Sequence, residues 1–243
     1  MVEVLKKQGD HGAAAEATEQ YLRVSPEAEA DFVKVAETFV VLRRMADADT
    51  RLAPAERHAK AEHYADRATV MVHQGAQAAR DDPKALSRLA WFLATCPDPK
   101  FRDPSRAVGL ARQAVGSDEA NGAIWNALGV AEYRNSDTRK AIEALSKSVE
   151  LTSGGSAGDW LFLAMAHWKQ GNKAPARSWY DKAVQWMEER KSQDDELRRF
   201  RDEAAALLGV TVPSAPTTKK EENTKGRPKP QLPGSSPSPP LKN

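Results

Sequence analysis

The fold is decided by two stretches, AIWNALGVAEYRNSDTRKAIEALSKSVEL at 123–151 and DWLFLAMAHWKQGNKAPARSWYDKAVQW at 159–186. In each stretch a tryptophan is followed 16 residues later by an alanine, and the two tryptophans, Trp125 and Trp160, are 35 residues apart. A large apolar residue follows each alanine after four residues, and a small residue follows it after seven. This spacing predicts a helix–turn–helix unit that is repeated along the chain.

Close packing within each unit explains the residue types. Large apolar residues at helical spacing form a buried stripe on the first helix. A small residue on that helix, Gly129 or Ala164, lets the second helix approach closely. The turn between the helices is marked by Asn135-Ser136-Asp137 in the first unit and by Gly171-Asn172 in the second. Since a single helix pair cannot bury its own apolar face, we expect neighbouring pairs to stack.

These residues resemble the tetratricopeptide repeat, whose signature is W-x2-L-G on the first helix and A-x3-F-x2-A on the second. The matching residues are Trp125, Leu128, Gly129 and Ala141, and Leu145 takes the place of the usual phenylalanine. The resemblance implies an all-α solenoid of antiparallel helix pairs. It also implies a non-catalytic scaffold that binds another protein, and this is the function that we expect.

Weaker copies of the unit precede the two clear ones. The anchoring alanine recurs at 14, 68, 107, 141 and 176, and the longest insertion between copies contains Pro54. The first copy begins partway into a repeat, without its first helix. We therefore expect the array to cover 1–209, with a half repeat at about 1–27, helix pairs at 29–80, 83–118, 122–155 and 157–190, and a capping helix at 192–209.

The capping helix is predicted by SQDDELRRFRDEAAALLG. Ser192 and Asp195 resemble a capping box, and Gly209 suits the C-terminal stop. One apolar stripe follows the helix: Leu197, Phe200, Ala204 and Leu207. A repeat array needs a terminal helix with a polar outer face to stay soluble.

A second resemblance gives an alternative function. The stretch LAWFLATCPDPKFRDPSRAVGLARQAV at 89–115 is similar to repeat regions that follow the catalytic domain of bacterial eukaryote-like serine/threonine kinases. This resemblance implies a regulatory or remnant region of a kinase-type signalling protein. The sequence itself has no glycine-rich G-x-G-x-x-G, no H-R-D and no D-F-G motif.

The composition separates a helical body from a tail at 210–243. Eight of the 15 prolines lie in the tail, which we expect to be disordered because it has few large apolar residues. Six basic and two acidic residues follow Thr211, so the tail carries a charge of +4 and the rest of the chain −2. A nearly neutral body argues against nucleic-acid binding. Gly226-Arg227-Pro228 resembles an AT-hook core and Pro230–Pro233 matches P-x-x-P, but the composition favours a plain solvated tail.

No catalytic or metal-ligating pattern is found, and we expect no enzyme, cofactor or metal. His58 and His63 are five residues apart, which misses the spacing of two ligands on one helical face, so solvated helix histidines are favoured. The single Cys96 lies in a proline-rich turn without an activating partner. No run of about 18 apolar residues could span a membrane. No secretory signal is evident, so we expect a cytoplasmic protein.

The resemblance also implies a binding groove, which the first helices of the repeats would line. A protein or peptide partner would lie in this groove as an extended segment or as a helix. Paired lysine and asparagine residues that would clamp a chaperone's terminal carboxylate are absent from the corresponding positions. The groove-lining residues expected from the resemblance are Trp91, Asn126, Val130, Tyr133, Arg134, Leu161, Met165, Trp168 and Lys169.

Overall fold

The computed structural model describes residues 1–24 and 32–211, and within these ranges all regular structure is helical. The chain divides into a helical unit, Met1–Val212, and a second unit, Pro213–Asn243. The tail motifs at 226–228 and 230–233 therefore lie outside the described residues, as does the predicted disorder of 212–243. The helices are α1 (Val2–Lys7), α2 (His11–Val24), α3 (Phe32–Ala48), α4 (Pro54–Ala78), α5 (Pro83–Thr95), α6 (Pro104–Ser117), α7 (Gly122–Arg134), α8 (Thr138–Leu151), α9 (Ala157–Lys169), α10 (Lys173–Glu189) and α11 (Asp195–Leu208), with a short 3₁₀ turn at Pro99–Phe101.

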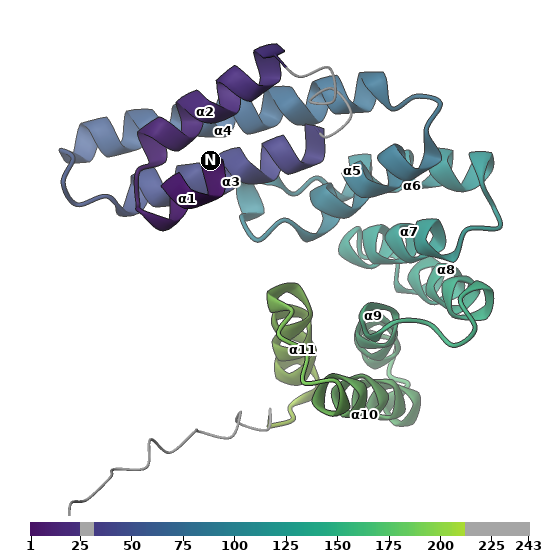
Figure 1. Cartoon of the computed structure of the whole chain (residues 1–243). Helices are drawn as coiled ribbons and strands as arrows, with labels where there is room; N and C mark the ends of the chain where they lie inside the picture. Colours follow the sequence, from purple (N-terminus) through teal and green to yellow (C-terminus); the bar gives the residue numbers. More distant parts are fainter. Residues whose placement is uncertain (25–31, 212–243) are drawn as a thin grey trace, which may run out of the picture. The chain divides into compact units, whose positions relative to one another are not determined.

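The helices pack in consecutive pairs, α1 with α2 and so on to α9 with α10 (Figure 1). The first helices of the pairs also contact one another in order, α3 with α5, α5 with α7 and α7 with α9. We call this series of helices the inner row. The all-α, tetratricopeptide-like architecture predicted from the sequence is confirmed.

Short polar residues set where the helices begin. The side chains of Asp82, Asp103, Asn121, Asp137 and Ser156 each accept hydrogen bonds from backbone N–H groups in the first turn of the following helix. These N–H groups have no partner within the helix, so an acceptor at the N-cap stabilises the end of the helix. The turn residues of the sequence therefore also define the helix boundaries.

Gly129 lies where α7 and α8 approach most closely. A Cβ atom at this position would lie 2.5 Å from Cγ of Leu145, whose side chain is fully buried. No side chain larger than hydrogen fits without a shift of α8, as the repeat pattern predicts. The same pattern places Trp125 and Trp160 in the repeat core; Trp160 is only 6% exposed, whereas Trp125 is only partly buried against the core. Each indole N–H donates to the carbonyl six residues earlier, of Glu119 and Gly154, at 2.8 Å in both cases.

We expect Gly129→Ala to destabilise the helical unit by about 1–3 kcal/mol, because the added methyl group overpacks the α7–α8 contact. Gly109→Ala is the matched control, since Gly109 lies within helix α6 and has nothing within 4 Å of an added Cβ. The control should be more stable than the unaltered chain by about 0.5–1 kcal/mol, because alanine lowers the entropy of the unfolded chain. Urea denaturation measures both changes, and equal midpoints for the two variants would contradict the close contact.

The N-terminal repeats differ from the expected pattern in two ways. The stretch predicted to lack a first helix begins with the six-residue helix α1, which packs on α2. The insertion around Pro54 is not a long loop, because Pro54 is the first residue of the 25-residue helix α4. A proline is well suited to the first helical turn, where its missing N–H costs no hydrogen bond.

His11 is a correction to the prediction that the histidines are solvated. His58, His63 and His73 are exposed, but His11 is buried at the start of α2. Its Nδ1 lies 3.1 Å from Tyr64 Oη and its Nε2 lies 3.3 Å from the Asp49 carboxylate. These contacts join α2 to α4 and to the turn that follows α3, so the role of His11 is structural.

Candidate protein-binding site

Helix α11 does not close the array by pairing with α10 alone. It packs more extensively on α9 than on α10, and its side chains also reach α5 and α7 of the inner row. Asp194, rather than Ser192, caps its N-terminus and accepts from the backbone N–H groups of Glu196 and Leu197. Gly209 ends the helix in the left-handed conformation at φ +65°, as predicted.

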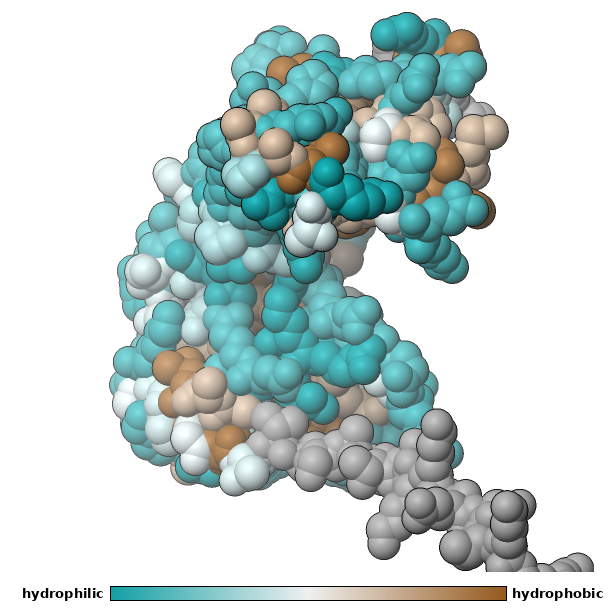
Figure 2. Space-filling model, turned by 90° about the vertical axis from the view of Figure 1, so that its left-hand side faces the viewer, coloured by the Kyte–Doolittle hydropathy of each residue, from teal (hydrophilic) through white to brown (hydrophobic). Residues whose placement is uncertain are grey.

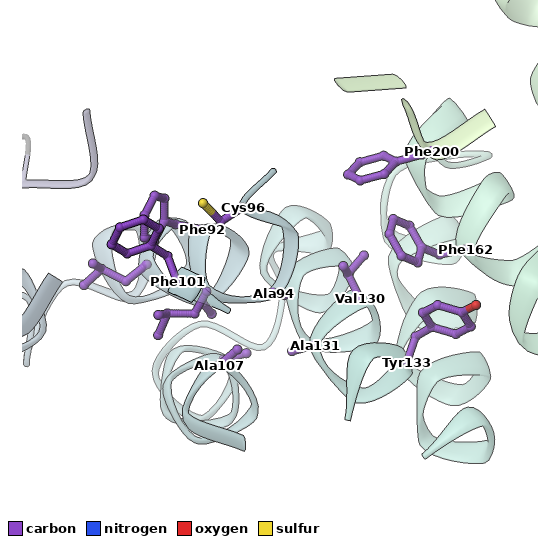
Figure 3. Packing of buried hydrophobic residues seen from close by; sticks show 14 of the residues in the cluster. Phe92, Ala94, Cys96, Phe101, Ala107, Val130, Ala131, Tyr133, Phe162 and Phe200 are labelled. Atoms are coloured by element: carbon purple, nitrogen blue, oxygen red, sulfur yellow. The ribbon is translucent and has the colours of Figure 1, made fainter. Parts of the chain in front are cut away.

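Four aromatic rings connect α11 to the inner row. Phe200 of α11 lies edge-to-face against Trp91 of α5 and Phe162 of α9, with ring centroids 6.0 and 4.9 Å apart. Phe162 in turn packs edge-to-face on Tyr133 of α7, at 5.4 Å. Figure 3 shows the rings of Phe200, Phe162 and Tyr133 following one another from α11 to α7. Phe200 is 1% exposed, so it is the apolar anchor of α11.

Polar contacts flank this anchor on both sides. The indole N–H of Trp91 donates to the Glu196 carboxylate at 3.2 and 3.3 Å. Arg134 of α7 binds the Glu203 carboxylate through both terminal guanidinium nitrogens, one of them at 2.7 Å. Arg199 donates to the carbonyl of Thr95, at the end of α5, at 2.9 Å. Helix α11 is therefore held by one aromatic ring, two carboxylates and one guanidinium, together with the buried side chains of Ala204, Ala205 and Leu208.

Several residues expected to line an open groove are buried. Leu161 and Met165 have no exposed surface, because α9 is surrounded by α7, α8, α10 and α11. Val130 is buried between α7 and its neighbours, and Tyr133 is 3% exposed beneath Phe162. The prediction that these four side chains are open to a ligand is wrong. The resemblance implies that the first helices of the repeats face solvent. In this chain, other helices cover them.

The other predicted residues fall into different surroundings. Trp91 and Arg134 are partly buried and hold α11. Asn126 is also partly buried and donates to the Asp159 carboxylate at 2.8 Å, which joins successive repeats. Trp168 is half-covered by Lys173, whose Nζ lies 3.4 Å from the ring centroid. Lys169 is exposed, with its Nζ 4.2 Å from the Tyr133 ring centroid.

An open pocket lies next to the N-terminal end of α11, where α3 and α5 of the inner row meet it. Its volume is about 580 Å³, and its walls come from α3, α5, the turn after α5 and the first turns of α11. We call it the α3–α5–α11 pocket; its apolar lining residues are Val40, Val41, Trp91, Phe92, Cys96 and Pro97. Figure 2 shows the helical unit hollowed between the N-terminal helices, at the top, and the C-terminal helices below them. Apart from Trp91, the sequence reasoning missed this apolar lining, because it comes from α3, α5 and the turn after α5, which meet α11 only in the folded chain.

Burial changes the titration of the groups around α11. It raises the pKa of the Glu196 carboxyl, and the nearby Arg199 and the Trp91 hydrogen bond only partly oppose this effect. It also lowers the pKa of the Arg199 guanidinium, against the attraction of Glu196. Burial raises the pKa of Tyr133 to about 12 and raises that of the Cys96 thiol. Docking of α11 therefore buries charged groups at a cost in solvation.

The described part of the chain has no group of three or more His, Cys, Asp or Glu side chains arranged to hold a metal ion. Within the same ranges, no helix combines the length and apolar composition that a membrane span requires. The helices and their side-chain contacts are thus the features on which a function can be argued.

Comparisons with known proteins agree with this architecture. Residues 100–156 and residues 160–189 match two models of the tetratricopeptide repeat, so this part of the chain consists of tetratricopeptide repeats. Such repeats generally serve as protein–protein interaction modules, and neither match supports the resemblance to kinase-associated regions. No curated protein matches the chain. A solved structure described as "Crystal structure of MamA" is similar at 15% sequence identity and a TM-score of 0.46, over 79% of this chain and 96% of that chain.

Proposed function

We propose that the chain is a non-catalytic scaffold that binds a peptide or helix of another protein on its inner row, at the α3–α5–α11 pocket. The observation that carries this proposal is an open, largely apolar pocket beside a helix that already occupies the rest of the row. Its volume of about 580 Å³ is ample for one large apolar side chain. Binding sites for partner chains are commonly built around such an anchor pocket.

The charges at the rim indicate what would surround the anchor. Arg44 is exposed at the pocket, which Glu37 of the same helix also lines, and the Arg44 side chain forms no hydrogen bond or ion pair with any described residue. Asp195 and Glu196, in contrast, are engaged by Arg198 and Trp91. An acidic residue of the partner next to its apolar anchor would therefore find Arg44 as a binding group.

A substitution inside the pocket tests this function. We expect Val41→Asp to weaken the binding of peptides selected on the full chain from a displayed library by ~tenfold or more, because it places a charge where an apolar side chain would lie. Val70→Asp is the matched control, since Val70 is 38% exposed on α4 and does not line the pocket. Fluorescence anisotropy of labelled peptides measures affinity, and circular dichroism checks that both variants keep their helicity.

The control should bind the selected peptides as tightly as the unaltered chain does. Selected peptides that bind Val41→Asp as tightly as Val70→Asp would show that the pocket is not the binding site. Failure to select any peptide on the unaltered chain would count against the scaffold function itself.

A further inference from the structure

We propose that α11 is a replaceable occupant of the inner row, and that the partner is a helix with the same contact pattern: a glutamate, a phenylalanine four residues later and a glutamate three residues after that. In α11 these residues are Glu196, Phe200 and Glu203. The inference rests on the proposed function, because it names the class of ligand for the same face. It adds that binding displaces a segment of the chain itself.

The contact pattern follows from helical geometry. Residues at i, i+4 and i+7 lie on one face of a helix, so Glu196, Phe200 and Glu203 face the inner row together. Phe200 fills the space between Trp91 and Phe162, while the two carboxylates reach Trp91 and Arg134. A helix from another protein that carries the same three side chains would meet the same partners. The row therefore selects for aromatic and acidic groups at fixed spacing.

The way in which α11 is held allows it to leave. A short segment, residues 190–194, joins it to α10, and it has no antiparallel partner helix of its own as α1 to α10 do. At its C-terminal end, Ala204, Ala205 and Leu208 are buried, and Arg177 of α10 donates to the carbonyl of Leu208 at 3.2 Å. Glu196 and Arg199 are partly exposed already, and departure of α11 would return the covered part of their side chains to water, which offsets part of the lost contact.

A tethered helix competes strongly with a free one, because its effective concentration is high. A partner must therefore gain a contact that α11 lacks, and the α3–α5–α11 pocket supplies it. The pocket lies directly beyond the first turn of α11, whose Asp195 and Glu196 form part of its wall. A partner helix longer by two turns at its N-terminal end would extend about 10 Å further. Its added residues would then reach Val41 and Arg44 of α3.

Peptide binding to full-length chains tests the inference. The probe is a labelled synthetic peptide with the sequence of residues 194–209, and its affinity is measured by fluorescence anisotropy. We expect it to bind the Phe200→Ala chain at least ~tenfold more tightly than the unaltered chain, whose own α11 blocks the site. Equal affinity for the two chains, or no binding to Phe200→Ala, would overturn the proposal.

A charge exchange provides an independent arm if Phe200→Ala loses its fold. In an Arg134→Glu chain, the introduced carboxylate repels Glu203 of α11. A probe peptide in which arginine replaces the residue equivalent to Glu203 should bind this chain at least ~tenfold more tightly than the unmodified probe does. Absence of that preference would overturn the proposal.

Two further outcomes separate this inference from the proposed function. Library peptides that bind at the pocket, while neither probe competes with them, would retain the scaffold function and reject displacement of α11. Light scattering of the unaltered chain at rising concentration should show monomers. Dimers that dissociate on Phe200→Ala would show that the occupant is α11 of a second copy, and this would also overturn the proposal.

Discussion

Phe200→Ala is expected to release α11 from the inner row. The substitution should lower the free energy of undocking of α11 by about 3–5 kcal/mol. The ring is 1% exposed and lies between Trp91 and Phe162, so its removal leaves a cavity that neither neighbour can fill without moving. The remaining contacts of α11 are the buried side chains of Ala204, Ala205 and Leu208 and the polar contacts of Glu196 and Glu203. Phe200 is the largest of its buried side chains, so its loss removes the largest single share of the apolar packing.

Hydrogen exchange of the backbone amides in 195–208 measures this release, since protection depends on the free energy of local opening. Leu197→Ala is the matched control, because Leu197 belongs to the same helix but is only partly buried. The control should retain most of the protection. Unchanged exchange in Phe200→Ala would show that α11 is held by contacts other than its aromatic anchor.

The reaction rate of the Cys96 thiol should also report the release of α11. Cys96 is 2% exposed and lines the α3–α5–α11 pocket next to Thr95, whose carbonyl accepts from Arg199. We expect Phe200→Ala to raise its rate of reaction with a thiol reagent by about two orders of magnitude, because ~3 kcal/mol of lost docking increases the open population by that factor. The urea-unfolded chain gives the limiting rate.

The pH dependence of this reaction has a defined direction. Burial raises the pKa of the Cys96 thiol above its ordinary value, so in the unaltered chain the reactive thiolate forms only at more alkaline pH. Release of α11 should move the midpoint of the pH–rate curve down towards the value of an exposed cysteine. The control Leu197→Ala should keep the curve of the unaltered chain, and an unshifted midpoint in Phe200→Ala would contradict the release.

The fold was predictable because its signals are local. The 16-residue step from Trp125 to Ala141 and the small residue at Gly129 describe contacts within one helix pair. Such contacts depend on side-chain size at fixed spacing, which a single sequence shows directly. The α11 stop at Gly209 and the N-cap at Asp137 are local in the same way.

The site was less predictable because its contacts are distant in the chain. Trp91 and Glu196 are 105 residues apart, and no periodicity relates them. The apolar stripe of α11 looks the same whether the helix packs on α10 or crosses the inner row. Single-repeat positions therefore gave Val130 and Tyr133 as groove residues, although other helices cover both.

The crossing of α11 has a consequence for how the chain unfolds. In a linear array each repeat contacts only its neighbours, so parts of it can melt separately. Helix α11 joins α5, α7 and α9 through Trp91, Arg134 and Phe162. While α11 is docked, loss of structure in one of these three repeats weakens the contacts of the other two. Residues 83–189 should thus unfold in one cooperative step when α11 is docked, whereas release of α11 should let the repeats melt separately.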